Sequence, residues 1–206
     1  MTSIEIETAH GRAVAHLHAA AEPAGLLVLG HGAGGGIGAP DLVAVTGVAL
    51  GLGVDVALVE QPYRVAGRRS PAPARQLDAA WIAVVEHLLA GLPRDLPLVV
   101  GGRSSGARVA CRTAAATGAA GVLCLAFPTR PPQRQGRERA PDRVGELGAV
   151  GVPVLIVQGE GDPFGMPPAA PGREVVAVRG NHSLRSDREG LVAAVTRWLP
   201  GVLALR

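Results

Sequence analysis

Leu98-Val99-Val100-Gly101-Gly102-Arg103-Ser104-Ser105-Gly106 joins a short apolar run to a segment rich in small residues that continues to about Ala116. The apolar run predicts a strand buried on both faces, and the small-residue segment predicts a helix. The junction matches G-x-S-x-G, in which a serine occupies a strained strand-to-helix turn and its flanking glycines let strand and helix approach. Centring the pattern on Ser105 would require glycine at Arg103, so Ser104 is the candidate nucleophile.

Apolar runs on both sides of this junction predict the rest of a sheet. Continuously apolar runs lie at 26–29, 98–100, 122–126, 154–157 and 175–178, and a further strand is expected at 54–59. Helical stretches are expected at 40–50, 77–88, 104–116 and 191–199. Residues 4–7 and 14–18 alternate apolar with polar, which is typical of an antiparallel hairpin at a sheet edge. This order predicts an α/β fold, with a mainly parallel sheet of about seven or eight strands and helices on both faces.

Length and composition favour one globular domain over residues 1–206. The chain has 206 residues and is 48% hydrophobic, and its 29 Gly and 17 Pro are spread between the apolar runs. Such a chain is long enough to bury a core without disulfides or metals. No insertion is long enough for a cap domain. The segment 128–141 could form only a short flap, because its prolines disfavour a helical lid.

The charge distribution gives no reason to expect nucleic acid as a partner. All 20 basic residues are Arg, the net charge is +3, and no basic stripe is interleaved with aromatic residues. The longest apolar stretch, 42–59, contains three glycines and Asp55, so it is not expected to span a membrane. Residues 1–5 do not begin a signal peptide, and a cytoplasmic location is therefore expected. The sequence does not indicate the oligomeric state.

Neither a metal nor a cofactor is expected. His16 and His18 share one face of a strand but have no carboxylate or cysteine cluster beside them. The glycine-rich loop 30–38 lacks the Lys-Ser/Thr of a phosphate-binding P-loop. Cys111 and Cys124 lie in apolar surroundings and are expected to be free core residues.

A base and an acid follow later strands. A serine hydroxyl is a weak nucleophile, so it needs a base within hydrogen-bond reach and a third group that orients this base. His182 follows the last expected strand and Asp162 the strand before it, and loops after parallel strands meet at one edge of the sheet. Asp162 could instead be a turn residue, because Asp-Pro favours turns, and Glu160 is a rival acid.

Acyl transfer also needs hydrogen-bond donors for the oxyanion. The backbone N–H groups of Ala33 and Ser105 are the candidates, since each follows a strand end. His31 is expected to orient this loop, with a role as general base as the alternative. Candidate substrate-binding residues are His31, Gly32, Arg103 and Arg64. Arginines near strand ends, among them Arg68 and Arg69, suggest an acidic substrate, but structural ion pairs explain Arg64 and Arg103 equally well.

Four motifs together resemble the α/β-hydrolase superfamily: G-H-G-A-G-G at 30–35, G-G-R-S-S-G-A-R at 101–108, Q-G-E-G-D-P-F-G at 158–165 and G-N-H-S at 180–183. The resemblance extends from about 25 to 199 and includes the loop at 62–64. Within the superfamily the chain resembles small lidless bacterial hydrolases related to the hydrolase-like domain of NSL complex subunit 3 and to testis-expressed protein 30, and the dienelactone hydrolases more distantly. This likeness implies Ser104 as nucleophile, Asp162 as acid and His182 as base, and it implies no substrate.

Two functions follow as hypotheses. The first is a serine hydrolase that cleaves an ester, thioester or related acyl bond of a small soluble substrate through an acyl-enzyme, with acyl transfer and amide hydrolysis left open. Aromatic residues make up only 2% of the chain, which disfavours a large pocket for long acyl chains. The second is a non-catalytic interaction module, which the animal relatives suggest. Such a module would not need Ser104 Oγ within hydrogen-bond reach of His182.

Overall fold

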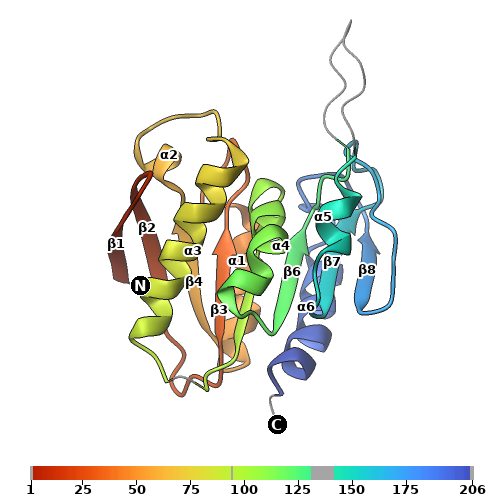
Figure 1. Ribbon diagram of the computed structural model, residues 1–206. Helices are drawn as coiled ribbons and strands as arrows, with labels where there is room; N and C mark the ends of the chain where they lie inside the picture. Colours follow the sequence, from red (N-terminus) through yellow and green to blue (C-terminus); the bar gives the residue numbers. More distant parts are fainter. Residues whose placement is uncertain (1, 94, 131–141, 205–206) are drawn as a thin grey trace, which may run out of the picture.

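The chain forms one eight-stranded sheet in the order β1-β2-β4-β3-β5-β6-β7-β8. The computed structural model describes residues 2–93, 95–130 and 142–204, and Figure 1 shows the sheet with helices in front and behind. The strands are β1 (Thr2–Thr8), β2 (Gly11–His18), β3 (Leu26–Gly30), β4 (Asp55–Glu60), β5 (Leu98–Arg103), β6 (Gly121–Leu125), β7 (Val154–Gly159) and β8 (Arg173–Val178). Strands β3 to β8 run parallel, which confirms the mainly parallel sheet.

The expected N-terminal hairpin is present at one edge. Strand β1 pairs antiparallel with β2, with Ile6 opposite Ala13, and β2 pairs antiparallel with β4. Ile6, Ala13 and Ala15 are buried, so the alternating pattern does mark one buried face. The edge strand is β1, whereas β2, which carries His16 and His18, lies inside the sheet. His16 Nε2 lies 3.0 Å from the Glu60 carboxylate on the neighbouring strand.

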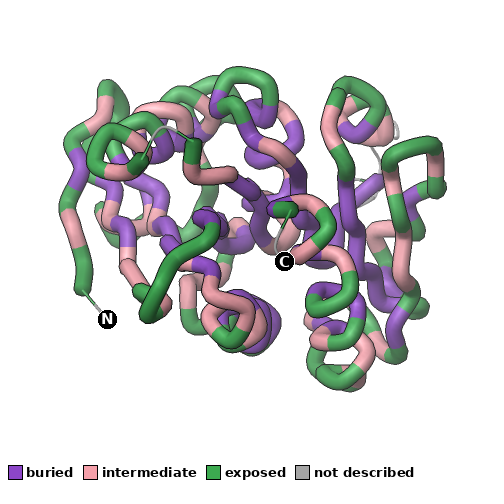
Figure 2. The backbone as a smooth tube through the Cα atoms, turned by 90° about the horizontal axis from the view of Figure 1, so that it is seen from below, coloured by how far each residue is buried: buried purple, intermediate pink, exposed green. Residues whose placement is uncertain are grey.

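The central strands are buried on both faces, as their continuous apolar runs predict. Every residue of β3, β6 and β7 is buried. The tube in Figure 2 shows these buried segments through the middle of the molecule, with exposed segments around them. Because hydrophobic side chains point alternately to the two faces, the sheet needs a helical layer on each side.

Two helical layers cover the sheet. The helices are α1 (Pro40–Gly51), α2 (Pro62–Val65), α3 (Ala74–Ala90), α4 (Ser105–Thr117), α5 (Val144–Gly148) and α6 (Arg188–Leu203). Helices α3 and α4 cover one face, where Trp81 and Phe127 are fully buried. Helices α1 and α6 cover the other face, where Leu42 and Leu199 are fully buried. Cys111 of α4 and Cys124 of β6 are free and buried in the core beneath α3 and α4, as expected, with their Sγ atoms 3.5 Å apart.

The structure differs from the sequence-based expectation in three places. The short helices α2 and α5 were not expected, because four or five residues give no periodic apolar pattern. Helix α6 continues past Pro200, beyond its expected end at Leu199. The additional turn places Leu203 in the core, 4% exposed. Most of the possible flap at 128–141 lies outside the described residues. Within the described ranges, no cap domain interrupts the sheet, and no helix combines the length and hydropathy needed to cross a bilayer.

Candidate active site

The residue between β5 and α4 is Ser104, and its backbone is strained. Its φ of 53° and ψ of −104° lie in a region that residues with a side chain rarely adopt. Such a conformation costs on the order of 1–3 kcal/mol and persists only where the surrounding structure imposes it. Here the Ser104 N–H donates to the Leu125 carbonyl at 2.8 Å, and its own carbonyl accepts from the Arg108 N–H at 3.2 Å. The turn therefore projects the hydroxyl from the end of the central strand.

The glycines around this turn are required by close packing. A Cβ atom at Gly106 would lie 2.3 Å from the Gly30 carbonyl oxygen, and one at Gly102 would lie 2.5 Å from the same oxygen. Both contacts are with backbone atoms, which cannot rotate away. The expectation that small residues must flank the serine is confirmed, and β3 is the element that imposes it.

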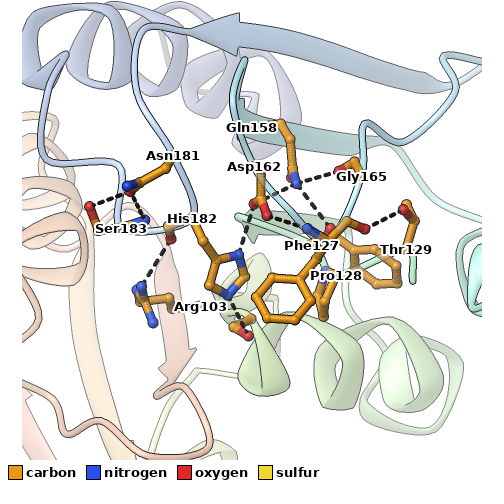
Figure 3. Close-up of polar contacts among 12 residues, drawn as sticks. Arg103, Phe127, Pro128, Thr129, Gln158, Asp162, Gly165, Asn181, His182 and Ser183 are labelled. Atoms are coloured by element: carbon orange, nitrogen blue, oxygen red, sulfur yellow. Dashed lines mark hydrogen bonds and ion pairs between the residues drawn. The ribbon is translucent and has the colours of Figure 1, made fainter. Parts of the chain in front are cut away.

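Three side chains from separate loops form a continuous hydrogen-bonded chain. His182 Nε2 lies 2.9 Å from Ser104 Oγ, and His182 Nδ1 lies 2.8 Å from Asp162 Oδ2. The Asp162 side chain is 1% exposed and that of His182 19% exposed. Figure 3 shows the His182 imidazole pointing to the Asp162 carboxylate. This geometry allows the imidazole to accept the serine proton while Nδ1–H donates to the carboxylate.

Gln158 and Phe164 fix the Asp162 carboxylate. The Gln158 amide donates to Asp162 Oδ2 at 2.8 Å, and the Phe164 N–H donates to Oδ1 at 2.9 Å. The Phe164 ring also packs edge-on against His182, with ring centroids 4.5 Å apart. Glu160, the rival acid, is exposed. The structure thus places Asp162, and not Glu160, against the imidazole.

His31 anchors the loop after β3. Its Nε2 accepts a hydrogen bond from the Gln61 N–H at 3.2 Å, so the proton resides on Nδ1, which donates to the Gly32 carbonyl at 2.8 Å. Burial lowers the pKa of His31, which keeps the ring neutral. Because His31 is 3% exposed and both ring nitrogens are used, binding of substrate by this side chain would require breaking these bonds.

The same loop carries the candidate oxyanion donors. Tyr63 donates its hydroxyl proton to the Ala33 carbonyl at 2.8 Å, and burial raises the pKa of Tyr63 to about 12, so this donor stays protonated. A Cβ atom at Gly32 would lie 3.7 Å from Ser104 Cβ, which places the loop beside the serine. Within the described part of the chain, the N–H groups of Ala33 and Ser105 have no hydrogen-bond acceptor. Both donors are therefore available to a ligand.

Arg103 is held by the protein. Its Nε lies 2.8 Å from Asp41 Oδ2, and its Nη2 donates to the His182 carbonyl at 2.9 Å. Asp41 is 1% exposed, and burial raises its pKa although Arg103 opposes that shift. The alternative of a structural ion pair thus accounts for Arg103. The Arg64 guanidinium donates only to the Arg68 carbonyl, at 3.3 Å, among the described residues.

An open cavity of about 370 Å³ lies beside these residues. Its lining consists of Gly35, Gly36, Gly38, Ala39, Pro40, Arg103, Ser183 and Arg185. Sequence reasoning missed Arg185, three residues after His182, although its position in the loop was visible. It also missed Gln158, which stands in one of the motifs and whose role depends on a tertiary contact. No group of three His, Cys, Asp or Glu side chains in the described ranges is arranged to hold a metal ion.

Residues 23–188 match a family model described as an alpha/beta hydrolase domain. The chain belongs to the α/β-hydrolase family. The matched residues include Ser104, Asp162 and His182. No curated protein matches this α/β-hydrolase in sequence, and the narrower resemblance to lidless bacterial hydrolases with animal relatives stays a prediction.

Solved structures share the fold of this α/β-hydrolase at low sequence identity. A serine hydrolase without a lid from Xanthomonas campestris has a TM-score of 0.74 and 19% identity, covering 97% of this chain and 95% of that one. Est1E from Butyrivibrio proteoclasticus has a TM-score of 0.75 and 16% identity, covering 99% and 100%. Dienelactone hydrolase from Anabaena variabilis has a TM-score of 0.73 and 15% identity, covering 98% and 96%. At such identities the likeness concerns the fold alone.

Proposed function

We propose that this α/β-hydrolase is a serine hydrolase that cleaves an ester, thioester or related acyl bond of a small soluble substrate. The observation that carries the proposal is the chain from Ser104 Oγ through His182 to Asp162, with distances of 2.9 and 2.8 Å. An interaction module has no physical need for a strained serine held against an imidazole. The names of the structural neighbours, which include serine hydrolases and an esterase, agree with this class.

The reaction follows from the positions of the three side chains. Ser104 Oγ attacks the acyl carbon while its proton passes to His182 Nε2, and the carbonyl oxygen becomes an oxyanion. The Ala33 and Ser105 N–H groups would stabilise this oxyanion, because neither donates to another described residue. His182 then gives the proton to the leaving alcohol or thiol, and the acyl-enzyme remains on Ser104.

Water completes the turnover by the reverse arrangement. His182 Nε2 takes a proton from the attacking water, the hydroxide adds to the acyl-enzyme, and collapse returns the proton to Ser104 Oγ with release of a carboxylic acid. Throughout, Asp162 holds Nδ1–H and stabilises the transient imidazolium. Gln158 and the Phe164 N–H keep the carboxylate in place.

Stopped-flow hydrolysis of 4-nitrophenyl acetate tests the proposal. Wild-type protein is expected to release a rapid burst of nitrophenolate, about one per chain, if deacylation is slower than acylation. Ser104→Ala should lose the burst and all turnover above its buffer control, whereas Ser70→Ala, at an exposed serine, should match the wild type. Equal hydrolysis by wild type and Ser104→Ala would contradict the proposed mechanism.

A further inference from the structure

The cavity next to the serine turn has a positive lining that the proposed mechanism does not use. Arg103 and Arg185 both line it, and its described lining includes no Asp or Glu. Two of its residues are direct chain neighbours of the reacting side chains, because Arg103 precedes Ser104 and Ser183 follows His182. In Figure 3 Arg103 and Ser183 lie on the side of His182 opposite to Asp162. The cavity is therefore lined by chain neighbours of Ser104 and His182, on the side of His182 away from the Asp162 carboxylate.

The two arginines differ in how their charge is balanced. Arg103 is paired with buried Asp41, so this pair adds little net charge. Arg185 is exposed, and no carboxylate lies within ion-pair distance of it in the described residues. The unbalanced positive charge at the cavity is thus that of Arg185.

Hydrogen-bond donors at this cavity also remain free. Arg103 Nη1 and the Gly36 N–H donate to no other residue within the described ranges. The Ser183 hydroxyl does not add to them, because it donates to Asn181 Oδ1 at 2.8 Å. Gly36 and Gly38 have no atoms near the position of a Cβ, which leaves room for a ligand.

We propose that this cavity binds a carboxylate carried by the acyl substrate, with Arg185 as the principal contact and Arg103 Nη1 and the Gly36 N–H as further donors. An arginine guanidinium matches the two oxygens of a carboxylate with parallel hydrogen bonds. The inference rests on the proposed function, which it deepens by naming the substrate class. The preferred substrates are acidic esters whose carboxylate lies a few carbons from the scissile carbonyl.

Matched esters test the preference. The mono-4-nitrophenyl esters of succinic, glutaric and adipic acid are compared with 4-nitrophenyl butyrate, valerate and hexanoate, which have the same chain lengths without the charge. In wild type at least one acidic ester should have the higher kcat/KM of its pair. Arg185→Gln should lower the ratio of kcat/KM for the acidic ester to kcat/KM for its neutral counterpart about tenfold, mainly through a higher KM for the acidic ester. Arg185→Lys should restore part of this ratio. Arg188→Gln, at a nearby exposed arginine, should leave the ratio unchanged.

A binding measurement separates the subsite from catalysis. Saturation-transfer NMR with glutarate should show binding to wild type and to Arg188→Gln, weaker binding to Arg185→Gln, and no binding of neutral glutaramide. Because Arg185 is exposed, added salt should weaken the glutarate signal. The subsite would be overturned, and the proposed function left intact, by the following combination of results: neutral esters are hydrolysed, Arg185→Gln has the same ratio of acidic to neutral kcat/KM as wild type, and glutarate binding does not depend on Arg185. Arg185-dependent glutarate binding without hydrolysis of any ester would support the subsite and contradict the proposed function.

Discussion

Replacing Gly106 by alanine should displace the serine turn without touching any reacting atom. The new Cβ would lie 2.3 Å from the Gly30 oxygen, 2.5 Å from its carbonyl carbon and 2.9 Å from the His31 oxygen. All three are backbone atoms of β3 and the loop after it. To reach even 3.0 Å, the shortest separation that Cβ atoms tolerate, the start of α4 must withdraw by about 0.7 Å.

This displacement has two measurable consequences. Ser104 is two residues away, so a shift of this size directed away from His182 would lengthen the Oγ–Nε2 distance from 2.9 Å to about 3.6 Å, beyond hydrogen-bond reach. A misplacement approaching 1 Å lowers rates on the order of a hundredfold. Overpacking of this kind also destabilises by about 1–3 kcal/mol, which corresponds to a fall in Tm of about 2–12 °C for a domain of this size.

The assay compares Gly106→Ala with Gly47→Ala. Gly47 lies exposed in the middle of α1 with no atom within 4 Å of its Cβ position, so alanine there should raise stability by about 0.5–1 kcal/mol and leave kcat/KM unchanged. Thermal unfolding by circular dichroism and 4-nitrophenyl acetate hydrolysis are measured on both. A folded Gly106→Ala variant with wild-type kcat/KM and Tm would refute the packing argument.

Three further predictions concern the groups around the site. Asp162→Asn should lower kcat for ester hydrolysis by about 10³–10⁴ while Tm stays near that of wild type, because the imidazole loses its orienting acceptor; kinetics with normal kcat would contradict this role. Arg103→Met should destabilise the protein by about 3–5 kcal/mol in urea unfolding, because Asp41 is left buried without its partner, and the additional change Asp41→Asn should recover much of the loss; an undiminished free energy of unfolding in the single variant would exclude the ion pair as a stabilising contact. Asp187 caps α6, and its hydrogen bonds from the Gly190 and Arg179 N–H groups hold its pKa below the ordinary value of 3.8. A depressed folded pKa gives stability that is present above that ordinary value and lost as the pH falls through the folded one, so the lower Tm of Asp187→Ala should approach wild type in acid; a Tm gap that persists there would contradict the assignment.

The sequence predicts much of the sheet because the relevant signals are local. Buried parallel strands need continuous apolar runs, and the runs at 26–29 and 122–126 match β3 and β6 to within one residue at each end. The position of Ser104 is also visible in the sequence, because the glycines that close packing against β3 requires stand two residues before and after it. Asp162 and His182 also follow parallel strands, and loops after such strands share one edge of the sheet, so the sequence predicts that they lie near Ser104.

The contacts missed by sequence reasoning join residues far apart in the chain. The sequence allows an ion pair for Arg103 but does not give its partner, because Asp41 lies 62 positions earlier and only the packing of α1 beside the serine turn brings the two within 2.8 Å. Gln158 ends an apolar strand, and its role depends on where the Asp162 loop turns back. Helix α5 is too short to show a period of its own, and its Glu146 is held by Arg108 and Arg112 of α4. Such pairings depend on the assembled fold and leave no periodic trace in the sequence.

Labelling with a fluorophosphonate probe shows whether Ser104 is an activated nucleophile. We expect one adduct per chain, located on Ser104 by peptide mass spectrometry, that is absent in Ser104→Ala and forms much more slowly in His182→Ala. Folded wild-type protein that remains unlabelled, or that is labelled equally in Ser104→Ala, would contradict this expectation.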